Sequence, residues 1–337
     1  MDTKIIDKKS EWEGFIAKHP EANFLHSWYW GEFQELIGRK IIRSGFYSNT
    51  KLAGVMLAIV EPAKRAKYLV VPGGPIIDWN NKGLVTAFGK ELRNLGKIHN
   101  CVFARIRPQL EDSDFSRTTF HKLGFSGAPM YLHAELTSQL DIRKSEGELL
   151  GNMRKATRYE IKQAMSLGIK IEQNGDKNIK DFYKLQLETS RRQKFVPFAK
   201  DFLEAQFHTF IKNDKAILYT AKYKNKTLAQ AFIILYGQEA VYHYGASTKE
   251  GRKFPGAYLI QWEAIREAKK RGMIRYNLWG VSPLDSNDHR FAGLSLFKRG
   301  FGCTDFAYLP AQDLVFNRSR YLINYLIEKS RRFLRRV

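Results

Sequence analysis

Cysteine is scarce in this sequence: Cys101 and Cys303 are the only two among 337 residues. Two thiols so far apart do not make a disulfide framework, and they predict small core residues in a reducing compartment. The eight histidines show no pair at metal-ligand spacing and no accompanying cysteine cluster. We therefore expect neither a structural nor a catalytic metal.

Long apolar segments are missing as well. No N-terminal apolar run resembles a signal peptide, and no uninterrupted apolar stretch is long enough to span a bilayer. We therefore expect a cytoplasmic protein. Hydrophobic residues still make up 44% of the chain, which is ample for packed cores, and the length predicts two domains.

Acidic residues are few relative to basic ones. The 34 Asp and Glu against 56 Lys and Arg give a formal net charge of +22. Such an excess gathers polyanions, whether RNA, DNA, nucleotide phosphates or an anionic membrane face. The charge alone does not choose among these partners, and a merely soluble basic protein remains an alternative.

Two segments 176 residues apart share one pattern. Tyr47–Leu57 and Tyr223–Ile233 both predict a strand, a tight turn at an asparagine and a second strand, with Tyr, Asn, Leu and Ala in identical places. The same offset relates Gly96 to Gly272, each expected to end a helix, and Lys122-Leu-Gly-Phe125 to Lys298-Arg-Gly-Phe301. The chain is therefore predicted to hold two copies of one α/β unit.

The second copy predicts a strand, a turn at Lys253–Gly256, a helix over Ala257–Arg271 and a further strand. This order resembles the central part of the GNAT acyltransferase fold. In that fold a glycine-rich turn holds the coenzyme A pyrophosphate on backbone N–H groups. Here Tyr258 stands where the second small residue of the turn belongs, so we do not expect a coenzyme A site.

Two basic helices are predicted outside these copies. Ser145-Glu-Gly-Glu148 is a capping box that opens a helix ending at Gly168, whose cationic side is either a solvated face or a surface for RNA or phosphate. Asn317–Val337 forms an amphipathic helix rich in arginine. We expect Tyr321–Ile327 to pack on the first domain, and the last turn to be available to an anionic membrane.

Six stretches, in order along almost the whole chain, resemble segments of the Fem family (FemX, FemA and FemB) of peptidoglycan bridge-forming aminoacyltransferases. They are Phe24–Gly31, Tyr68–Asp78, Met153–Ile161, Glu188–Arg192 with Phe195, Tyr242–Ser247 and Phe297–Gly302. The resemblance implies an α/β fold of two GNAT-like domains. We expect the first over residues 1–144, joined by the helix 317–337, and the second over 145–316. With no heptad insertion between Arg192 and Lys298, we expect no coiled-coil arm, as in compact FemX.

The resemblance also implies the reaction. An amino acid passes from aminoacyl-tRNA, which acts as co-substrate, to the stem peptide of lipid II or UDP-MurNAc-pentapeptide, and no cofactor or DNA takes part. A peripheral contact with the inner face of the plasma membrane is compatible with a lipid-linked acceptor. Two alternatives remain: an acyl-CoA-dependent N-acyltransferase of GNAT type, and a non-enzymatic basic RNA-binding protein.

Lys298 matches the family lysine that stabilises the tetrahedral oxyanion of aminoacyl transfer, and Phe297 beside it shapes the site. A structural role is the alternative, because Lys122 occupies the equivalent place in the first copy. Arg192 matches the arginine that grips the phosphates of the acceptor, a task suited to a planar guanidinium. The alternative is a surface arginine next to Arg191.

Three further residues are candidate acceptor contacts. Tyr244 is one, although aromatic strand residues often belong to the core. Asp78 is another, unless it only caps a turn. Gln34 stands where the family has a basic residue on its first helix, and Gly73 stands where the family has an arginine. These two departures favour lipid II or an unusual precursor over a UDP-linked acceptor.

Overall fold

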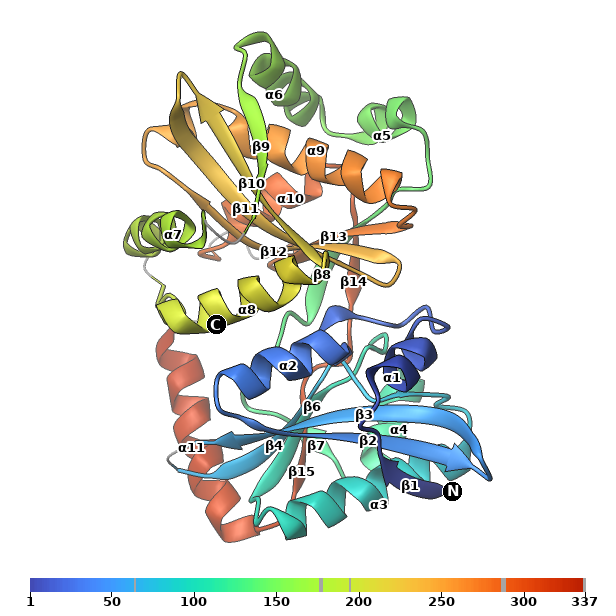
Figure 1. The fold of residues 1–337 in the computed structure, drawn as a ribbon. Helices are drawn as coiled ribbons and strands as arrows, with labels where there is room; N and C mark the ends of the chain where they lie inside the picture. The colour runs from blue at the N-terminus through green and yellow to red at the C-terminus, as the bar shows by residue number, and fades with distance from the viewer. Residues whose placement is uncertain (64, 176–177, 194, 286–288, 336–337) are drawn as a thin grey trace. The chain divides into compact units, whose positions relative to one another are not determined.

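The chain folds into two compact units. The structure, a computed structural model, describes residues 1–63, 65–175, 178–193, 195–285 and 289–335. For residues 333–335 it describes the backbone only. Unit 1 comprises Met1–Glu135 and Ala307–Val337, and unit 2 comprises Leu136–Phe306. Each unit is built on its own mixed sheet (Figure 1). None of the described helices is both long enough and apolar enough to cross a membrane.

The sheet of unit 1 has the strand order β1-β2-β3-β4-β6-β15-β7, with the short strand β5 on β3. Neighbouring strands are antiparallel except for β4 and β6, which pair in parallel. The strands are β1 Asp2–Ile5, β2 Lys40–Ser48, β3 Lys51–Pro62, β4 Lys67–Pro72, β5 Ile76–Ile77, β6 Phe103–Arg107, β7 Ser126–Gly127 and β15 Gln312–Val315.

The sheet of unit 2 repeats this arrangement in the order β9-β10-β11-β12-β13-β8-β14. Its parallel pair of β12 with β13 corresponds to β4 with β6 in unit 1. The strands are β8 Leu136–Asp141, β9 Lys170–Asn174, β10 Ala216–Tyr223, β11 Lys226–Tyr236, β12 Glu239–Ser247, β13 Arg275–Gly280 and β14 Thr304–Ala307.

One strand of each sheet comes from a distant part of the sequence. β8 follows unit 1 in the chain but pairs with β13, and β15 follows unit 2 but pairs with β6. The predicted limits at residues 144 and 316 therefore differ from those of the structure by one strand each. The backbone hydrogen bonds of β8 and β15 assign these strands to their units.

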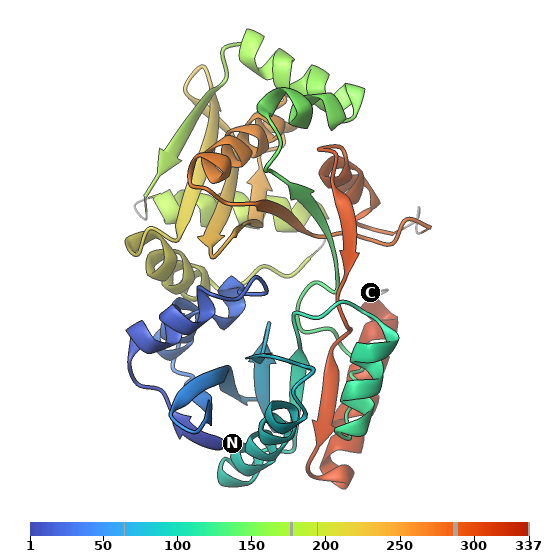
Figure 2. The ribbon, with the colours of Figure 1, turned by 90° about the vertical axis from the view of Figure 1, so that its right-hand side faces the viewer.

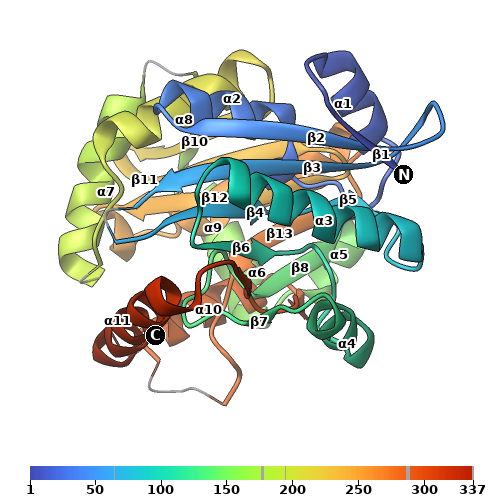
Figure 3. The same ribbon diagram turned by 90° about the horizontal axis from the view of Figure 1, so that it is seen from below.

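Helices cover both faces of the unit 1 sheet. α1 (Lys9–Ile16) and α2 (Trp28–Leu36) lie on one face, and α3 (Lys82–Ile98) and α4 (Asp114–Lys122) on the other (Figure 1). α3 packs against β1, β2, β3 and β6, and Figure 3 shows it lying across this sheet. Alternate residues Met56, Ala58 and Val60 of β3 share a core with residues of α3, including Phe88 and Leu92. Strand and helix periodicities thus meet in one apolar layer.

Unit 2 is layered in the same way. α9 (Gly256–Lys270) packs on the sheet, and α6 (Lys155–Ser166) packs on α9. On the opposite face α7 (Ile179–Gln193) contacts β12 and α8 (Lys200–Lys212) contacts β10. There the rings of Phe207 and Phe232 stack at 3.7 Å. The short helices α5 (Glu146–Asn152) and α10 (Ala292–Arg299) complete the unit.

The predicted duplication is correct, although its register is not constant. The hairpin turns match at an offset of 175 and not at the predicted 176, because Ser48↔Lys51 closes the first turn and Tyr223↔Lys226 closes the second. Asn49, with φ of 56°, therefore corresponds to Lys224, with φ of 46°. Gly272 follows α9 with φ of 74°. Gly96, however, lies inside α3. A Cβ on Gly96 would lie 2.4 Å from the ring of Phe316, so close packing explains this glycine.

The predicted equivalence of Lys122 and Lys298 is wrong. The left-handed glycine that follows α4 is Gly124, with φ of 86°, and the one that follows α10 is Gly302, with φ of 81°. Gly300 has a right-handed φ of −59°. Counting back from the left-handed glycines, Lys298 corresponds to Phe120, a core residue, while Lys122 is exposed.

The predicted single helix after Ser145 is two helices. The capping box is present, because the Ser145 N–H donates to Glu148 Oε2 at 2.9 Å, and Gly168 ends the second helix with φ of 73°. Between them Met153 and Arg154 are extended. The Arg154 N–H donates to the carbonyl oxygen of Gly300 at 2.9 Å, so the break docks on the turn after α10.

The C-terminal helix α11 (Arg318–Arg335) belongs to unit 1 and runs beside β15 (Figure 2). The Tyr321 hydroxyl donates to Asp313 Oδ2 at 2.8 Å. Arg105 of β6 binds Asp313 through two nitrogens, both at 2.8 Å, and Glu328 Oε2 at 2.7 Å. The side chains of Phe333 and Arg335, and residues 336–337 at the end of the predicted amphipathic helix, lie outside the described part of the structure.

Candidate active site

The candidate site of unit 2 lies where β12 and β13 separate. These strands pair in parallel only from Glu239↔Arg275 to Val241↔Asn277. Beyond that point β12 is irregular opposite Phe232 and Ile233, and β13 is irregular between Asn277 and Gly280. Because the strands have separated, the carbonyl oxygen of Gly280 has no hydrogen-bond partner in a parallel ladder with β12.

Trp279 sets the direction of that carbonyl group. Its φ is 65°, a left-handed conformation that side chains other than glycine rarely adopt. The Trp279 N–H donates to Asn277 Oδ1 at 2.8 Å, which stabilises the turn. Backbone strain of this kind persists where the surrounding structure holds it, often at functional sites.

Lys298, in the last turn of α10, reaches this point. Its Nζ donates to the Gly280 carbonyl oxygen at 2.6 Å and lies 5.8 Å from the centre of the Tyr242 ring. Only 6% of Lys298 is exposed, and burial lowers the pKa of its amine to about 7. Within the described residues no carboxylate forms an ion pair with it. A buried, unneutralised amine is a typical feature of functional sites.

The turn after α10 fixes the position of Lys298. A Cβ on Gly300 would lie 2.5 Å from Thr157 Oγ1, and a Cβ on Gly302 would lie 2.8 Å from the Asn152 carbonyl oxygen. Glycine at both places lets the α5–α6 connection approach the backbone closely. The stretch around Met153–Ile161 and the stretch around Phe297–Gly302 are therefore one packed structure.

Phe297 belongs to the core of unit 2. Its ring meets those of Tyr258 at 4.8 Å and Phe301 at 5.3 Å, both edge to face. Phe297 thus supports the helix that carries Lys298 from the core side. Tyr258, at the start of α9, packs against the same ring, so an aromatic side chain occupies the place where the GNAT turn has a small residue.

Arg192 and the side chain of Tyr244 lie on the other face of β12. Arg192 Nη2 donates to the Ser247 carbonyl oxygen at 3.0 Å and to its hydroxyl at 3.1 Å. The Tyr244 hydroxyl donates to Gln206 Oε1 at 3.0 Å. Tyr242, which faces Lys298, is in the core under α9, whereas Tyr244 packs near Phe207 of α8. The irregularity in β12 thus turns these two tyrosines to opposite faces.

Gln34 and Asp78 lie in unit 1 and have local partners. Gln34 is buried, and its Oε1 accepts a hydrogen bond from Arg39 Nη1 at 2.8 Å. Arg39 also pairs with Glu61 at 3.0 Å. Asp78 is exposed, and its Oδ1 accepts the Asn80 N–H at 2.9 Å. Asp78 therefore does cap the turn before α3.

Sequence reasoning missed the residues that build the Lys298 environment. Gly280 and Trp279 have no motif of their own, because the strand separation that gives them their role is a tertiary feature. His26 was also missed: its Nδ1 bonds the Pro72 carbonyl oxygen at 3.0 Å, and its Nε2 accepts the Leu57 N–H at 2.9 Å. Burial lowers the pKa of His26 to about 4, so this histidine is a neutral structural link.

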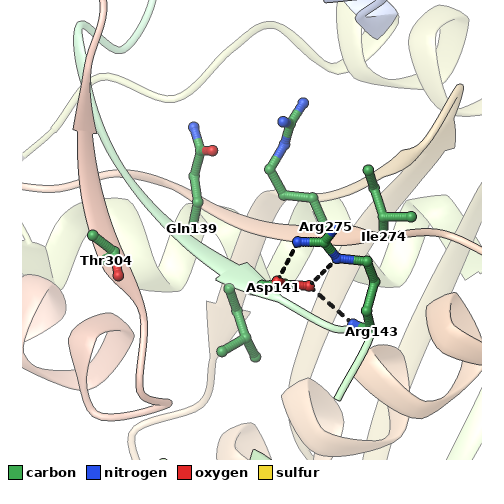
Figure 4. A pocket seen from close by; sticks show the side chains of 7 residues that line it. Gln139, Asp141, Arg143, Ile274, Arg275 and Thr304 are labelled. Carbon is green, nitrogen blue, oxygen red and sulfur yellow. Dashed lines mark hydrogen bonds and ion pairs between the residues drawn. The ribbon is translucent and has the colours of Figure 1, made fainter. Parts of the chain in front are cut away.

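A separate cavity of about 270 Å³ lies at the other end of β13. Figure 4 shows Asp141 and Arg143 paired at its edge, at 2.6 Å. Arg275, which also lines it, bonds Glu239 Oε1 at 2.7 Å. Lys298 is not among its lining residues. Arg275 begins β13 and Gly280 ends it, so this cavity and the lysine site are distinct.

Comparisons with known protein sequences give one consistent family. The model of the FemAB family matches residues 8–123, 114–226 and 212–329. The aminoacyltransferase FemA of Staphylococcus epidermidis is 23% identical to this chain, and the alignment covers 83% of this chain and 88% of that protein. FemA of Staphylococcus aureus strain MRSA252 is also 23% identical, with 78% and 82% covered.

Comparisons with solved structures show the fold. The crystal structure of FemX matches with a TM-score of 0.87 and 19% identity, over 97% of this chain and 100% of that one. A tandem GNAT protein from the clavulanic acid biosynthesis pathway matches with a TM-score of 0.53 and 11% identity, over 82% and 83%. The predicted pair of GNAT-like units is therefore confirmed. The expected lack of a coiled-coil arm is also confirmed for the described residues between Arg192 and Lys298.

Proposed function

The chain belongs to the FemAB family, and from this premise we propose that it is an aminoacyltransferase of peptidoglycan bridge synthesis. It transfers an amino acid from aminoacyl-tRNA to the amine of a stem peptide, carried by lipid II or by UDP-MurNAc-pentapeptide. The family match over residues 8–329 carries this proposal, and the likeness to the FemA aminoacyltransferases supports it.

The Lys298 site suits this chemistry. The acceptor amine attacks the ester carbonyl, a C–N bond forms, and the C–O bond to the tRNA ribose breaks. The amine proton leaves with the ribose oxygen. Negative charge develops on the carbonyl oxygen in between, and N–H donors fixed in a dry site stabilise it. Lys298 is buried and held by Gly280, so it supplies such donors without reorganisation.

We propose that the reaction needs no cofactor, because the ester already carries its leaving group. Cys303 is an unsuitable nucleophile, since burial raises the pKa of its thiol to about 12. Lys298 therefore acts on the oxyanion directly, with no covalent intermediate on the enzyme.

Arg192 is proposed as a contact for acceptor phosphates. Its Nη2 is committed to Ser247, and its Nη1 lies 3.7 Å from Glu188 Oε1. Within the described part of the chain, its Nε and Nη1 are buried and make no hydrogen bond, and an anionic ligand that reached them would supply the acceptors they lack. Tyr244 on the same face is the second proposed contact of unit 2. Asp78 and Gln34 are the proposed acceptor contacts of unit 1, and Phe297 supports Lys298.

The acyl-CoA-dependent alternative predicts coenzyme A binding at the start of α9. The ring of Tyr258, packed on Phe297, argues against it. The RNA-binding alternative predicts binding of tRNA whether or not it is charged, and no transfer. The basic residues of α6, among them Lys155 and Lys162, are exposed. They are compatible both with a tRNA-dependent transferase and with an RNA-binding protein.

A transfer assay tests the proposal. The protein is incubated with a pool of radiolabelled aminoacyl-tRNAs and, in parallel reactions, with lipid II or UDP-MurNAc-pentapeptide. Labelled muropeptide is expected with one of the two acceptors. Tight coenzyme A binding without labelled product would favour a GNAT acyltransferase. Equal binding of charged and uncharged tRNA without product would favour an RNA-binding protein.

A further inference from the structure

The outward face of α11 is apolar. Leu322, Ile323 and Leu326 are 57%, 62% and 56% exposed. Leu322 and Leu326 are one turn apart, and Ile323 adjoins them, so the three side chains form a continuous strip on one side of the helix. Three large aliphatic side chains exposed together on one helix are unusual for a surface that meets only water.

The inward face of the same helix carries the polar groups, and the ring of Tyr321 on this face also packs edge to face on Phe103 at 5.2 Å. Tyr321 bonds Asp313, and Glu328 bonds Arg105, at 2.8 and 2.7 Å. Asn324, between them on this face, is 5% exposed. An amphipathic helix of a water-soluble protein normally turns its apolar side to the core. α11 is inverted, and the buried Arg105–Asp313 pair holds it in that orientation.

The charges around the strip have one sign. Glu328 is the only acidic residue of the segment 318–337, and it is turned inward, where Arg105 bonds both Glu328 and Asp313. The exposed cationic residues of the helix are Arg318, Arg320, Lys329, Arg331 and Arg332. The strip of aliphatic side chains is bordered by cations and has no exposed acidic neighbours on the helix. It is therefore complementary to a partner that has an apolar interior beneath an anionic outer layer.

We propose that the outward face of α11 is a docking surface for an anionic lipid bilayer. The helix lies in the plane of the interface, with Leu322, Ile323 and Leu326 among the acyl chains and the cations at the headgroups. Aliphatic side chains offer nothing to the phosphates or bases of RNA. A second copy of the chain would bring two cationic faces together. The inference does not depend on the transfer reaction.

Vesicle co-sedimentation tests this surface in the full-length protein. The vesicles contain either phosphatidylcholine alone or phosphatidylcholine with phosphatidylglycerol. The wild type is expected to bind the anionic vesicles at least tenfold more strongly, and less so as salt is raised. A variant with Leu322→Ser, Ile323→Ser and Leu326→Ser should lose at least tenfold in binding. Replacing Lys329 and Arg331 by Gln should lower the preference for anionic lipid.

A matched control uses exposed apolar residues elsewhere in unit 1. Leu36 and Ile98 are 60% and 63% exposed, and a Leu36→Ser, Ile98→Ser variant should bind vesicles as the wild type does. Circular dichroism should show all variants folded. The triple variant should retain turnover on a soluble UDP-linked acceptor if the wild type has it, which separates membrane docking from the transfer reaction.

Several results would overturn the proposal. One is no binding of the wild type to anionic vesicles, and another is undiminished binding of the triple variant. A dimer that the three serine substitutions dissociate, measured by analytical ultracentrifugation without lipid, would assign the face to a second copy. A loss of tRNA affinity in the triple variant, with vesicle binding intact, would assign it to RNA.

Discussion

The amine of Lys298 lies 2.6 Å from the carbonyl oxygen of Gly280, at the end of a strand that has left its parallel neighbour. A carbonyl oxygen orients an amine but does not neutralise its charge. Burying an unneutralised charge costs several kcal/mol unless the pKa of the group shifts. The lowered pKa of Lys298 reflects that cost. A role in the reaction explains why a lysine occupies this buried position.

Lys298→Met should separate activity from stability. Methionine keeps the length and apolar stem of the side chain but provides neither charge nor N–H donors, so transfer should fall at least a hundredfold. The free energy of unfolding should rise by about 1–4 kcal/mol, because a buried charge is replaced by an apolar group of similar volume. Labelled-muropeptide assays and denaturant unfolding measure the two effects.

Lys122→Met is the matched control, since Lys122 has the same sequence context but is exposed. It should change the free energy of unfolding by less than about 0.5 kcal/mol and leave transfer unchanged. Unchanged turnover in the Lys298 variant would assign this lysine a structural role.

Stability should depend on pH through the same amine. Burial lowers the pKa of Lys298 from 10.5 to about 7. Between these values the unfolded chain binds the proton and the folded chain has released it. The free energy of unfolding contributed by this group therefore rises with pH from about 7 to 10.5. Below a pH of about 7 the amine is protonated in both states, and the buried ammonium then destabilises the folded protein to its full extent.

Denaturant titrations of wild type and Lys298→Met across that range test the sign, because the contributions of all other groups cancel in the difference. The stability advantage of the variant should shrink steadily as pH increases. A difference independent of pH would mean that Lys298 keeps an ordinary pKa in the folded protein.

Gly302→Ala should disturb the lysine through the backbone. Alanine is strained at φ of 81°, and its Cβ would lie 2.8 Å from the Asn152 carbonyl oxygen. We expect a loss of about 1–3 kcal/mol in the free energy of unfolding and at least a tenfold loss in kcat. Gly293→Ala in α10, where a Cβ meets nothing within 4 Å, should be neutral or stabilising by up to about 1 kcal/mol. Equal effects of the two substitutions would contradict the assigned role of the turn.

Arg192→Lys should weaken acceptor binding. Lysine cannot bond both oxygens of Ser247 and also present a planar donor edge to a phosphate. KM for the acceptor should rise about tenfold, which is about 1.4 kcal/mol of binding free energy, with a much smaller change in kcat. Arg191→Lys, at an exposed neighbour, should leave both constants as they are. A fall in kcat alone would place Arg192 outside the acceptor site.

The sequence by itself determined the elements and their repetition. Alternating apolar residues, Asn49 and Gly272 predicted strands, hairpins and a helix end, because these signals act within a few residues. Local signals failed where packing acts over distance. Gly96 is small because of Phe316, and the break at Met153–Arg154 exists because Arg154 bonds the backbone of Gly300.

Only the tertiary structure decided what distinguishes Lys298. In sequence its motif matches that of Lys122, and spacing cannot tell them apart. In the fold, the left-handed glycine of the second copy stands at Gly302, which moves Lys298 into the position of the buried Phe120. There the separation of β12 and β13 gives its amine a carbonyl partner. The physical reason is that burial and strand pairing, which set the charge and contacts of a lysine, depend on residues far from it in the chain.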